Sequence, residues 1–380
     1  MLKRRLFTPG PVPVPERVRL AMAREMIHHR AADFLPIFQH CKVGLQRIFQ
    51  TAEPVLIFSS SGTGAMDASV SNLLSPGDHA LVVRGGKFGE RWAEICEAYG
   101  VRATCIDVEW GTAVDPARVR DALAEHDDIK AVYVTASETS TGVRHPIREI
   151  AEIVRERDDR LIVVDAITAV GVYELPVDAW GLDVVVSGSQ KAFMMPPGLA
   201  FMALSERARR FHQSARCAHY YFDLGKEIKA LDGDQTAWTP AVSLLFGLEE
   251  ALRIILDEVG LEETWRRTER LAHATRESMR ALGLELYAPD DPSPALTAVR
   301  VPDGIDGPAL RKRLKDELGY TVADGQGAAK GKIFRIAHLG YFDRFDTIGA
   351  IAAVEMALAS LGFSFKLGEG VRTATELLRD

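Results

Sequence analysis

One lysine stands where an apolar, strand-like run meets a loop rich in proline and glycine. Lys191 follows the run Val184–Val186 and the sequence Ser-Gly-Ser-Gln, and it precedes Met195-Pro-Pro-Gly. A solvated surface charge poorly explains a lysine in this position. A partly desolvated amine loses its proton more easily and becomes a nucleophile, and such lysines form Schiff bases with carbonyl compounds. The sequence therefore predicts a lysine held for chemistry.

A carboxylate ends another apolar run. Asp165 follows Leu161–Val164, and a carboxylate at the end of a buried strand needs a cationic or hydrogen-bonding partner. That partner could be a structural cation. If the ligand instead contains a pyridine ring, the carboxylate keeps the ring nitrogen protonated and strengthens the ring as an electron sink. The 26 positions from Asp165 to Lys191 allow one further strand, so both side chains can reach one cleft.

A third group of residues could bind an anion. The loop Ser-Ser-Ser-Gly-Thr-Gly at 59–64 follows the apolar run Val55–Phe58 and opens a helix-like stretch. Free backbone N–H groups and the positive end of a helix favour phosphate, and the hydroxyls of Ser61 and Thr63 can add hydrogen bonds. An ordinary capped helix after a tight turn explains the same pattern. The spacing matches neither the dinucleotide fingerprint nor the Walker A motif.

Three further features are open to two interpretations each. The hydroxyl-rich segment 135–142 could contact a ligand or form an ordinary turn. Phe88 could stack on a planar ring or lie in the core. Arg335, on an apolar stretch, offers a planar fork that fits a carboxylate with two hydrogen bonds, or it pairs with a structural acid.

Short apolar runs alternate with helix-like stretches over most of the chain. The runs are hydrophobic on both faces, as strands of a covered parallel sheet must be, and the alternation is typical of α/β proteins. Ligands of such sheets gather at the carboxyl ends of the strands, which is where the candidates above stand. The predicted strands are 55–58, 80–83, 131–134, 161–164 and 184–186, and the predicted helices between them are 88–99, 116–125 and 147–157.

The pattern changes from about position 261. A long amphipathic helix is followed by a strand near 295–301, a helix near 308–318, a strand near 332–337 and a closing helix at 346–361. This order predicts a smaller α+β domain, and clefts between domains commonly bind small ligands. The predicted division is an N-terminal segment 1–20 that contacts the active site and the small domain, a large α/β domain 21–260 and a small C-terminal α+β domain 261–380.

Composition narrows the classes of function. The 380 residues, 47% of them apolar, supply a sizeable core, and a net charge of −7 without a long basic run gives no reason to expect nucleic acid or an anionic membrane as partner. No stretch has the length of a membrane span, and the basic N-terminus is followed by prolines rather than by a signal peptide's apolar region. The four cysteines lack CxxC spacing, so we expect no metal site, no disulfide framework and a cytoplasmic location.

Several of these residues together resemble a known family. Ser-Gly-Ser-Gln-Lys at 187–191, Pro-Pro-Gly at 196–198 and Asp165 one strand earlier are similar to the class V aminotransferases, which are pyridoxal-phosphate enzymes of fold type I. Within that family the sequence most resembles alanine:glyoxylate and serine:pyruvate aminotransferases. The resemblance covers nearly the whole chain. It implies a mostly parallel central sheet covered by helices, with the smaller α+β domain at the C-terminal end.

The resemblance also implies roles for individual residues. Lys191 would bind pyridoxal 5'-phosphate as a Schiff base and move the proton between the substrate α-carbon and the cofactor. Asp165 would pair with the pyridinium nitrogen, Arg335 would hold the substrate carboxylate, and Gly10 would help to close the substrate pocket. The other expected cofactor contacts are Ser61, Gly62, Thr63 and Gln190 at the phosphate, Thr139 at the ring edge, and Phe88 and Ile167 on the ring faces. Phe88 stands where the family often has tryptophan.

The same resemblance implies that a second subunit contributes to the site. The family borrows phosphate contacts from its dimer partner through a segment similar to residues 235–240 of this chain. Thr239 is the predicted contact, and Thr236 is the alternative. The resemblance therefore implies a homodimer with shared active sites.

The resulting functional prediction is a transaminase. It would move an amino group from a small amino acid, such as alanine or serine, to a 2-oxo acid such as glyoxylate or pyruvate, by a ping-pong mechanism. The alternatives are an aspartate or aminoethylphosphonate donor, a pyridoxal-phosphate lyase, and a non-catalytic assembly subunit of the same fold. A desulfurase is disfavoured because Gln190 stands where those enzymes carry histidine, and because no cysteine follows Cys217.

Overall fold

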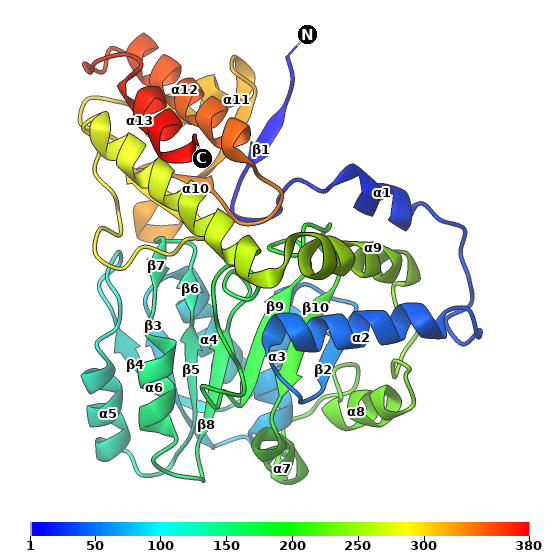
Figure 1. Cartoon of the computed structure of the whole chain (residues 1–380). Helices are drawn as coiled ribbons and strands as arrows, with labels where there is room; N and C mark the ends of the chain where they lie inside the picture. The colour runs from blue at the N-terminus through cyan, green and yellow to red at the C-terminus, as the bar shows by residue number, and fades with distance from the viewer. Residues whose placement is uncertain (1, 380) are drawn as a thin grey trace.

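A seven-stranded sheet forms the larger part of the computed structural model, which describes residues 2–379. The strand order is β2-β10-β9-β8-β5-β3-β4, and neighbouring strands are parallel except for β10, which is antiparallel to β2 and β9. The sheet is therefore mostly parallel, as predicted (Figure 1). Its strands are β2 (Val55–Phe58), β3 (His79–Arg84), β4 (Arg102–Asp107), β5 (Ile129–Thr135), β8 (Leu161–Asp165), β9 (Val184–Gly188) and β10 (Ala200–Leu204).

Helices cover both faces of this sheet, which is why its central strands are apolar on both sides. The helices α3 (Gly62–Leu73) and α4 (Lys87–Ala98) lie on the opposite face from α5 (Pro116–Glu125) and α6 (Ile147–Val154) (Figure 1). The strands β5, β8 and β9 are almost wholly buried between these layers. The remaining helices of this part are α2 (Leu35–Phe49), α7 (Glu206–Ser214), α8 (Leu224–Asp232) and α9 (Val242–Arg253).

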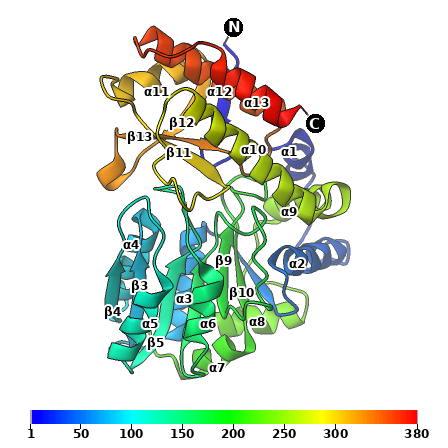
Figure 2. The same cartoon turned by 60° about the vertical axis from the view of Figure 1, so that its left-hand side comes forward.

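A smaller four-stranded sheet stands above the carboxyl ends of the large one (Figures 1 and 2). Its order is β1-β12-β13-β11, and β1 (Arg5–Phe7) pairs in parallel with β12 (Tyr320–Asp324). The N-terminal strand thus belongs to a sheet built otherwise from the C-terminal third of the chain. The other elements are β11 (Leu296–Arg300), β13 (Ile333–Ala337), α10 (Leu261–Ala281), α11 (Gly307–Asp316), α12 (Arg344–Ser360) and α13 (Glu369–Leu378).

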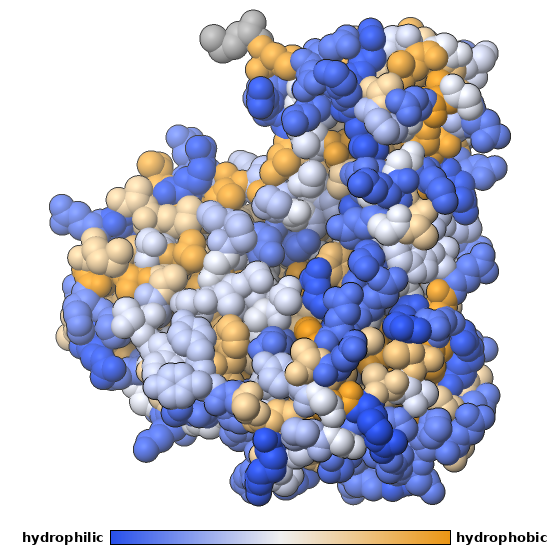
Figure 3. Space-filling view, turned by 180° about the vertical axis from the view of Figure 1, so that it is seen from behind, coloured by the Kyte–Doolittle hydropathy of each residue, from blue (hydrophilic) through white to orange (hydrophobic). Residues whose placement is uncertain are grey.

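Two connections join the parts built around these sheets. The helix α1 (Glu16–Met22) packs on α9, so the chain passes from the small sheet at β1 back to the large part. In the other direction, α9 continues through a π-helical turn (Ile254–Val259) into α10. The domain limits inferred from the sequence stay a prediction. Seen from behind, the surface is largely hydrophilic, and paler and apolar residues lie mostly at its left and centre (Figure 3). Within residues 2–379 no helix is long and apolar enough to span a bilayer.

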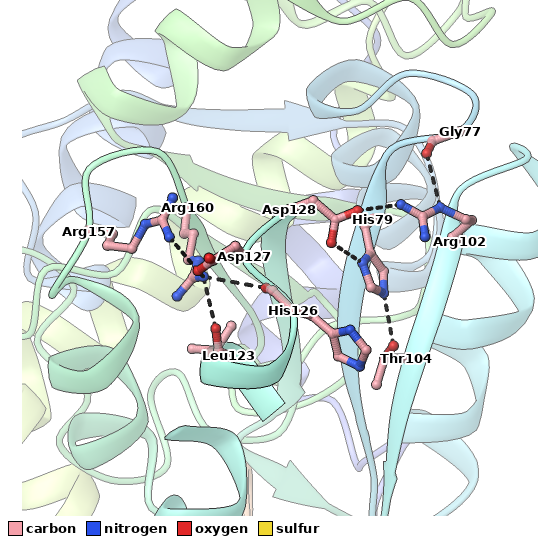
Figure 4. A network of polar contacts seen from close by, with 10 residues as sticks. All are labelled: Gly77, His79, Arg102, Thr104, Leu123, His126, Asp127, Asp128, Arg157 and Arg160. Carbon is pink, nitrogen blue, oxygen red and sulfur yellow. Dashed lines mark hydrogen bonds and ion pairs between the residues drawn. The ribbon is translucent and has the colours of Figure 1, made fainter. Parts of the chain in front are cut away.

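Hydrogen bonds between polar and charged side chains connect neighbouring strands at the amino-terminal edge of the large sheet (Figure 4). His79, at the start of β3, contacts Asp128 Oδ1 and Thr104 Oγ1 through its two ring nitrogens, each at 2.8 Å. Arg102, at the start of β4, donates to the other oxygen of Asp128 at 2.5 Å. These hydrogen bonds hold the Asp128 carboxylate in its charged form and lower its pKa to about 2. This edge lies opposite the carboxyl ends of the parallel strands, where ligands of such sheets bind.

Candidate active site

Residues from four strand ends and two helix starts meet in one cavity at the carboxyl edge of the large sheet. The cavity contains Lys191 and Asp165 together with most of the other predicted cofactor contacts. Its full lining is Ser61, Gly62, Thr63, Phe88, Arg91, Ser137, Thr139, Asp165, Ile167, Thr168, Gln190 and Lys191. A larger, open hollow of about 760 Å³ lies near Arg144 and Trp180 and contains none of the predicted site residues.

Lys191 lies in the turn that follows β9 and reaches across to the N-terminal segment. Its Nζ donates a hydrogen bond to the carbonyl oxygen of Pro9 at 2.5 Å. Burial lowers the pKa of this amine to about 8, although the Asp165 carboxylate partly opposes that shift. Gly10 packs against the same side chain so closely that a Cβ there would lie 2.2 Å from Nζ. The amine is therefore held in one place and loses its proton unusually easily.

Asp165 is the last residue of β8 and is only 3% exposed. One of its oxygens, Oδ1, accepts a hydrogen bond from the Ile167 backbone N–H at 2.9 Å. Burial raises the pKa of the carboxyl group to about 7. A cation with an N–H donor would satisfy this group and favour its charged form. A protonated ring nitrogen has that chemistry.

The start of α3 lies where the loop 59–64 predicts an anion site, and its geometry is suited to one. Ser61 precedes the helix and makes no side-chain hydrogen bond to it, so it does not cap the first N–H groups. The Oε1 atom of Gln190 is buried and lacks a partner within residues 2–379. Gly62 has to be small, because a Cβ there would lie 2.4 Å from Ile167 Cδ1. Helix N–H groups and the Ser61 and Thr63 hydroxyls can donate hydrogen bonds to a phosphate ester, and Gln190 can donate only through its amide NH₂ group.

Arg335 lies on β13 of the small sheet and reaches toward the cavity. It is 5% exposed, and it donates to the backbone oxygen of Asp324 at 2.8 Å and to that of Thr139 at 2.5 Å. In the described part of the chain no carboxylate forms an ion pair with Arg335, since Asp324 pairs with Arg311. Burial lowers the pKa of the guanidinium to about 10. The Glu138 and Asp324 carboxylates partly oppose this shift, but neither forms an ion pair with Arg335, so the buried guanidinium, beside a lining residue, is suited to an anionic ligand.

Two threonines of the 235–240 segment lie outside this cavity. Thr239 is exposed and borders a separate hollow together with Thr236. The hydroxyl of Thr236 donates to the carbonyl oxygen of Trp238 at 2.6 Å. Within one chain, therefore, the structure does not bring Thr239 to the other predicted site residues, and the Thr236 hydroxyl is already engaged.

Sequence reasoning missed several contributors. Arg91 lines the cavity, donates to Thr63 Oγ1 at 3.2 Å and lies over the Phe88 ring at 4.9 Å from its centroid. Helical spacing could have found it, because Arg91 stands one turn after Phe88 on the same face. Ser137 and Thr168 also border the cavity. The Pro9 carbonyl that accepts from Lys191 carries no side-chain signal at all.

A partly buried lysine and a buried aspartate at the carboxyl edge of a mostly parallel sheet, with a smaller α+β part above them, are typical of the pyridoxal-phosphate-dependent enzymes of fold type I. Residues 16–344 match the family described as Aminotransferase class-V. The chain therefore belongs to the class V aminotransferases, which confirms the predicted family, the fold class and the enzyme class of transaminase.

Similar proteins carry more than one name. The chain is 43% identical to the "Soluble hydrogenase, small subunit" of Synechococcus sp. (strain PCC 6716), over 99% of this chain and 98% of that protein. It is 37% identical to the serine--glyoxylate aminotransferase of Hyphomicrobium methylovorum, over 98% and 93%. An alanine--glyoxylate aminotransferase structure from Nostoc sp. superposes with a TM-score of 0.90 at 32% identity, covering 94% of this chain and 96% of that one.

Residues 2–379 contain no cluster of three or more histidine, cysteine or acidic side chains placed to hold a metal ion.

Proposed function

We propose that this chain binds pyridoxal 5'-phosphate and transfers the amino group of a small amino acid, such as alanine or serine, to a 2-oxo acid such as glyoxylate or pyruvate. The observation that carries the proposal is the pairing of two oppositely perturbed groups in one cavity. Lys191 has a pKa lowered to about 8, and Asp165 has one raised to about 7. Titratable groups perturbed in this way concentrate at catalytic sites. Two of the relatives named above act on glyoxylate by name.

Different lining residues would bind different parts of the cofactor. Ser61, Gly62 and Thr63, with the Gln190 amide, would hold the phosphate at the start of α3. Asp165 would accept a hydrogen bond from the ring nitrogen, which satisfies its buried carboxylate. Thr139 would contact the ring edge, and Phe88 and Ile167 would lie against the ring faces. When bound, the cofactor supplies an electron sink for the carbanion formed at the substrate α-carbon.

Lys191 performs the proton transfer in this proposal. Its amine is neutral near physiological pH for a substantial fraction of the time, because burial has lowered its pKa. A neutral amine could take a proton from the substrate α-carbon and deliver it to a carbon of the cofactor. The Pro9 carbonyl accepts a hydrogen bond from the amine and holds it over the cavity between these events.

Arg335 and the second subunit complete the proposed site. The guanidinium would bind the substrate carboxylate through two hydrogen bonds, since within residues 2–379 its acceptors are backbone oxygens and no carboxylate forms a direct ion pair with it. Thr239 would reach the phosphate of the partner in a homodimer with shared active sites. Its exposure supports this choice over Thr236, whose hydroxyl is bonded within its own chain. The cytoplasmic location expected from the cysteines stays a prediction.

The half-reaction tests the proposed function. Purified protein loaded with pyridoxal 5'-phosphate should convert, on addition of the true donor alone, to the pyridoxamine form with release of one 2-oxo acid. Absorbance spectra with alanine, serine, aspartate and aminoethylphosphonate identify the donor, and parallel initial-rate lines with glyoxylate or pyruvate confirm ping-pong kinetics. Protein that takes up no cofactor, or that needs both substrates before any conversion, contradicts the proposal.

The lowered pKa of Lys191 predicts how cofactor capture depends on pH. Only the neutral amine attacks the cofactor carbonyl, so the capture rate of cofactor-free protein should rise about tenfold per unit below about pH 8 and level off above it. An unperturbed lysine, with a pKa of about 10.4, would give a rate that still rises at pH 10. Stopped-flow absorbance between pH 6 and pH 10 distinguishes the two profiles, with free N-acetyl-lysine as the reference amine.

A further inference from the structure

The helix that carries Phe88 begins without a cap of its own. Gly86 precedes α4 and has no side chain to offer. The first three N–H groups of α4 instead donate hydrogen bonds to side chains of a segment about fifty residues later. The Lys87 N–H donates to Ser140 Oγ at 3.0 Å, and the N–H groups of Phe88 and Gly89 both donate to Glu138 Oε2 at 3.0 Å. The start of α4 is thus capped from outside the helix.

Glu138 is the centre of this contact. It is completely buried, and its second oxygen, Oε1, accepts from the N–H of Ser140 at 3.1 Å and from the hydroxyl of Ser140 at 2.6 Å. Burial raises the pKa of the carboxyl group, while these hydrogen bonds oppose the shift. The positive end of the α4 dipole further favours the charged form. Gly86 permits the close approach, because a Cβ there would lie 2.6 Å from Glu138 Cδ.

The same segment reaches the substrate side of the cavity. Thr139, between the two capping residues, lines the cavity, and its carbonyl oxygen accepts the 2.5 Å hydrogen bond from Arg335. Phe88 lines the cavity from α4. Residues 138–140 therefore contact the start of the helix that carries the ring platform and, one residue away, the guanidinium proposed to bind the substrate.

We propose that Glu138 is a positioning residue. It fixes the position of Phe88 relative to Thr139 and Arg335, and it thereby aligns the cofactor ring with the substrate carboxylate. This inference rests on the proposed function, because it names the cofactor and the substrate as the groups positioned. Glu138 touches neither of them: it holds the start of α4 through backbone N–H groups, and its charge acts on Arg335 and Asp165 without direct contact. Its carboxylate is suited to this task, since only an acceptor with two oxygens can take all four donors.

Glu138→Gln tests the proposal, because glutamine keeps the volume but replaces one acceptor oxygen by an NH₂ group that faces donors. We expect faster hydrogen exchange at amides 87–89 in the cofactor-free protein. In the loaded protein we expect about tenfold weaker cofactor affinity and an altered visible circular dichroism of the bound cofactor. Ser140→Ala, which removes only the Lys87 acceptor and one donor to Glu138, should shift all three in the same direction by less. Ser140→Ala provides the test of the proposal if Glu138→Gln folds poorly.

Glu355→Gln is the matched control. Glu355 is also a buried carboxylate that caps a helix start from outside, since it accepts from the N–H groups of Gly368 at 2.6 Å and Val371 at 2.9 Å near the beginning of α13. It lies outside the lining of the cavity. Its variant should speed exchange at amides 368–371 and leave cofactor affinity and dichroism unchanged.

The outcomes separate this proposal from the proposed function. If Glu138→Gln speeds exchange at amides 87–89 but binds the cofactor with wild-type affinity and dichroism, Glu138 is a structural cap and the positioning role is wrong. Unchanged exchange at these amides overturns it as well. Failure of the proposed function looks different, because wild-type protein would then take up no cofactor at all.

Discussion

Lys191→Ala is expected to lower the turnover of the loaded enzyme by at least about 10³-fold, because a general base of this kind contributes about 10²–10⁴-fold and no other amine of the cavity lining can replace it. The variant should also lose the covalent link to the cofactor. Borohydride treatment of the wild type should therefore leave a protein heavier by one reduced cofactor, and the same treatment of the variant should leave the mass of the chain alone. Mass spectrometry and donor-dependent turnover measure the two effects.

Lys42→Ala is the control for this experiment. Lys42 is also partly buried, but its Nζ pairs with Asp234 at 2.7 Å on the side of α2, outside the cavity. Its variant should keep both the added mass and the turnover. Turnover within tenfold of the wild type in Lys191→Ala, or cofactor mass still attached to it, would show that Lys191 is not the reacting amine.

Apolar strands and their carboxyl ends made much of the site predictable. A strand covered on both faces must be apolar at every position, so runs such as Leu161–Val164 and Val184–Val186 identify β8 and β9 without further information. Parallel strands end at the same edge of a sheet. Asp165 and Lys191 could therefore be expected in one cleft, and they do line the same cavity.

Other features depend on partners that are distant along the chain. The role of Glu138 follows from the start of α4, and a lone glutamate in a hydroxyl-rich segment carries no sign of that contact. The strand β1 joins the small sheet only because β12, more than 300 positions later, offers an edge to it. Residues 5–7 alone do not specify such a pairing. The partner-chain contact proposed for Thr239 likewise lies beyond what one chain contains.

The N-terminal segment links the small sheet to Lys191. β1 pairs with β12, and the chain then passes Pro9, whose carbonyl accepts from Lys191 Nζ, and Gly10, which packs on the same side chain. A movement of the small sheet relative to the large one would carry this segment with it. The position of the amine is therefore coupled to the placement of the sheet that holds Arg335.

Gly10→Ala is accordingly expected to lower kcat by about 10²-fold, since a displacement of about 1 Å in a reacting group can cost that much. Gly10 has a φ of +129°, and an added Cβ would lie 2.2 Å from Nζ and 2.5 Å from Cε of Lys191. The lysine side chain is the flexible partner, so it must move. The rate of covalent cofactor capture should fall together with kcat, and steady-state kinetics and stopped-flow absorbance measure the two rates.

Two comparisons separate this steric effect from backbone strain. Gly77 has a φ of +87°, and a Cβ added there would meet no heavy atom within 4 Å, so Gly77→Ala should cost about 1 kcal/mol of unfolding free energy and leave kcat unchanged. In a Lys191→Ala background the clash at Gly10 is absent, so Gly10→Ala should destabilise that protein less than it destabilises the wild type. Equal destabilisation in both backgrounds, or a wild-type kcat for Gly10→Ala, would show that Gly10 does not position the lysine.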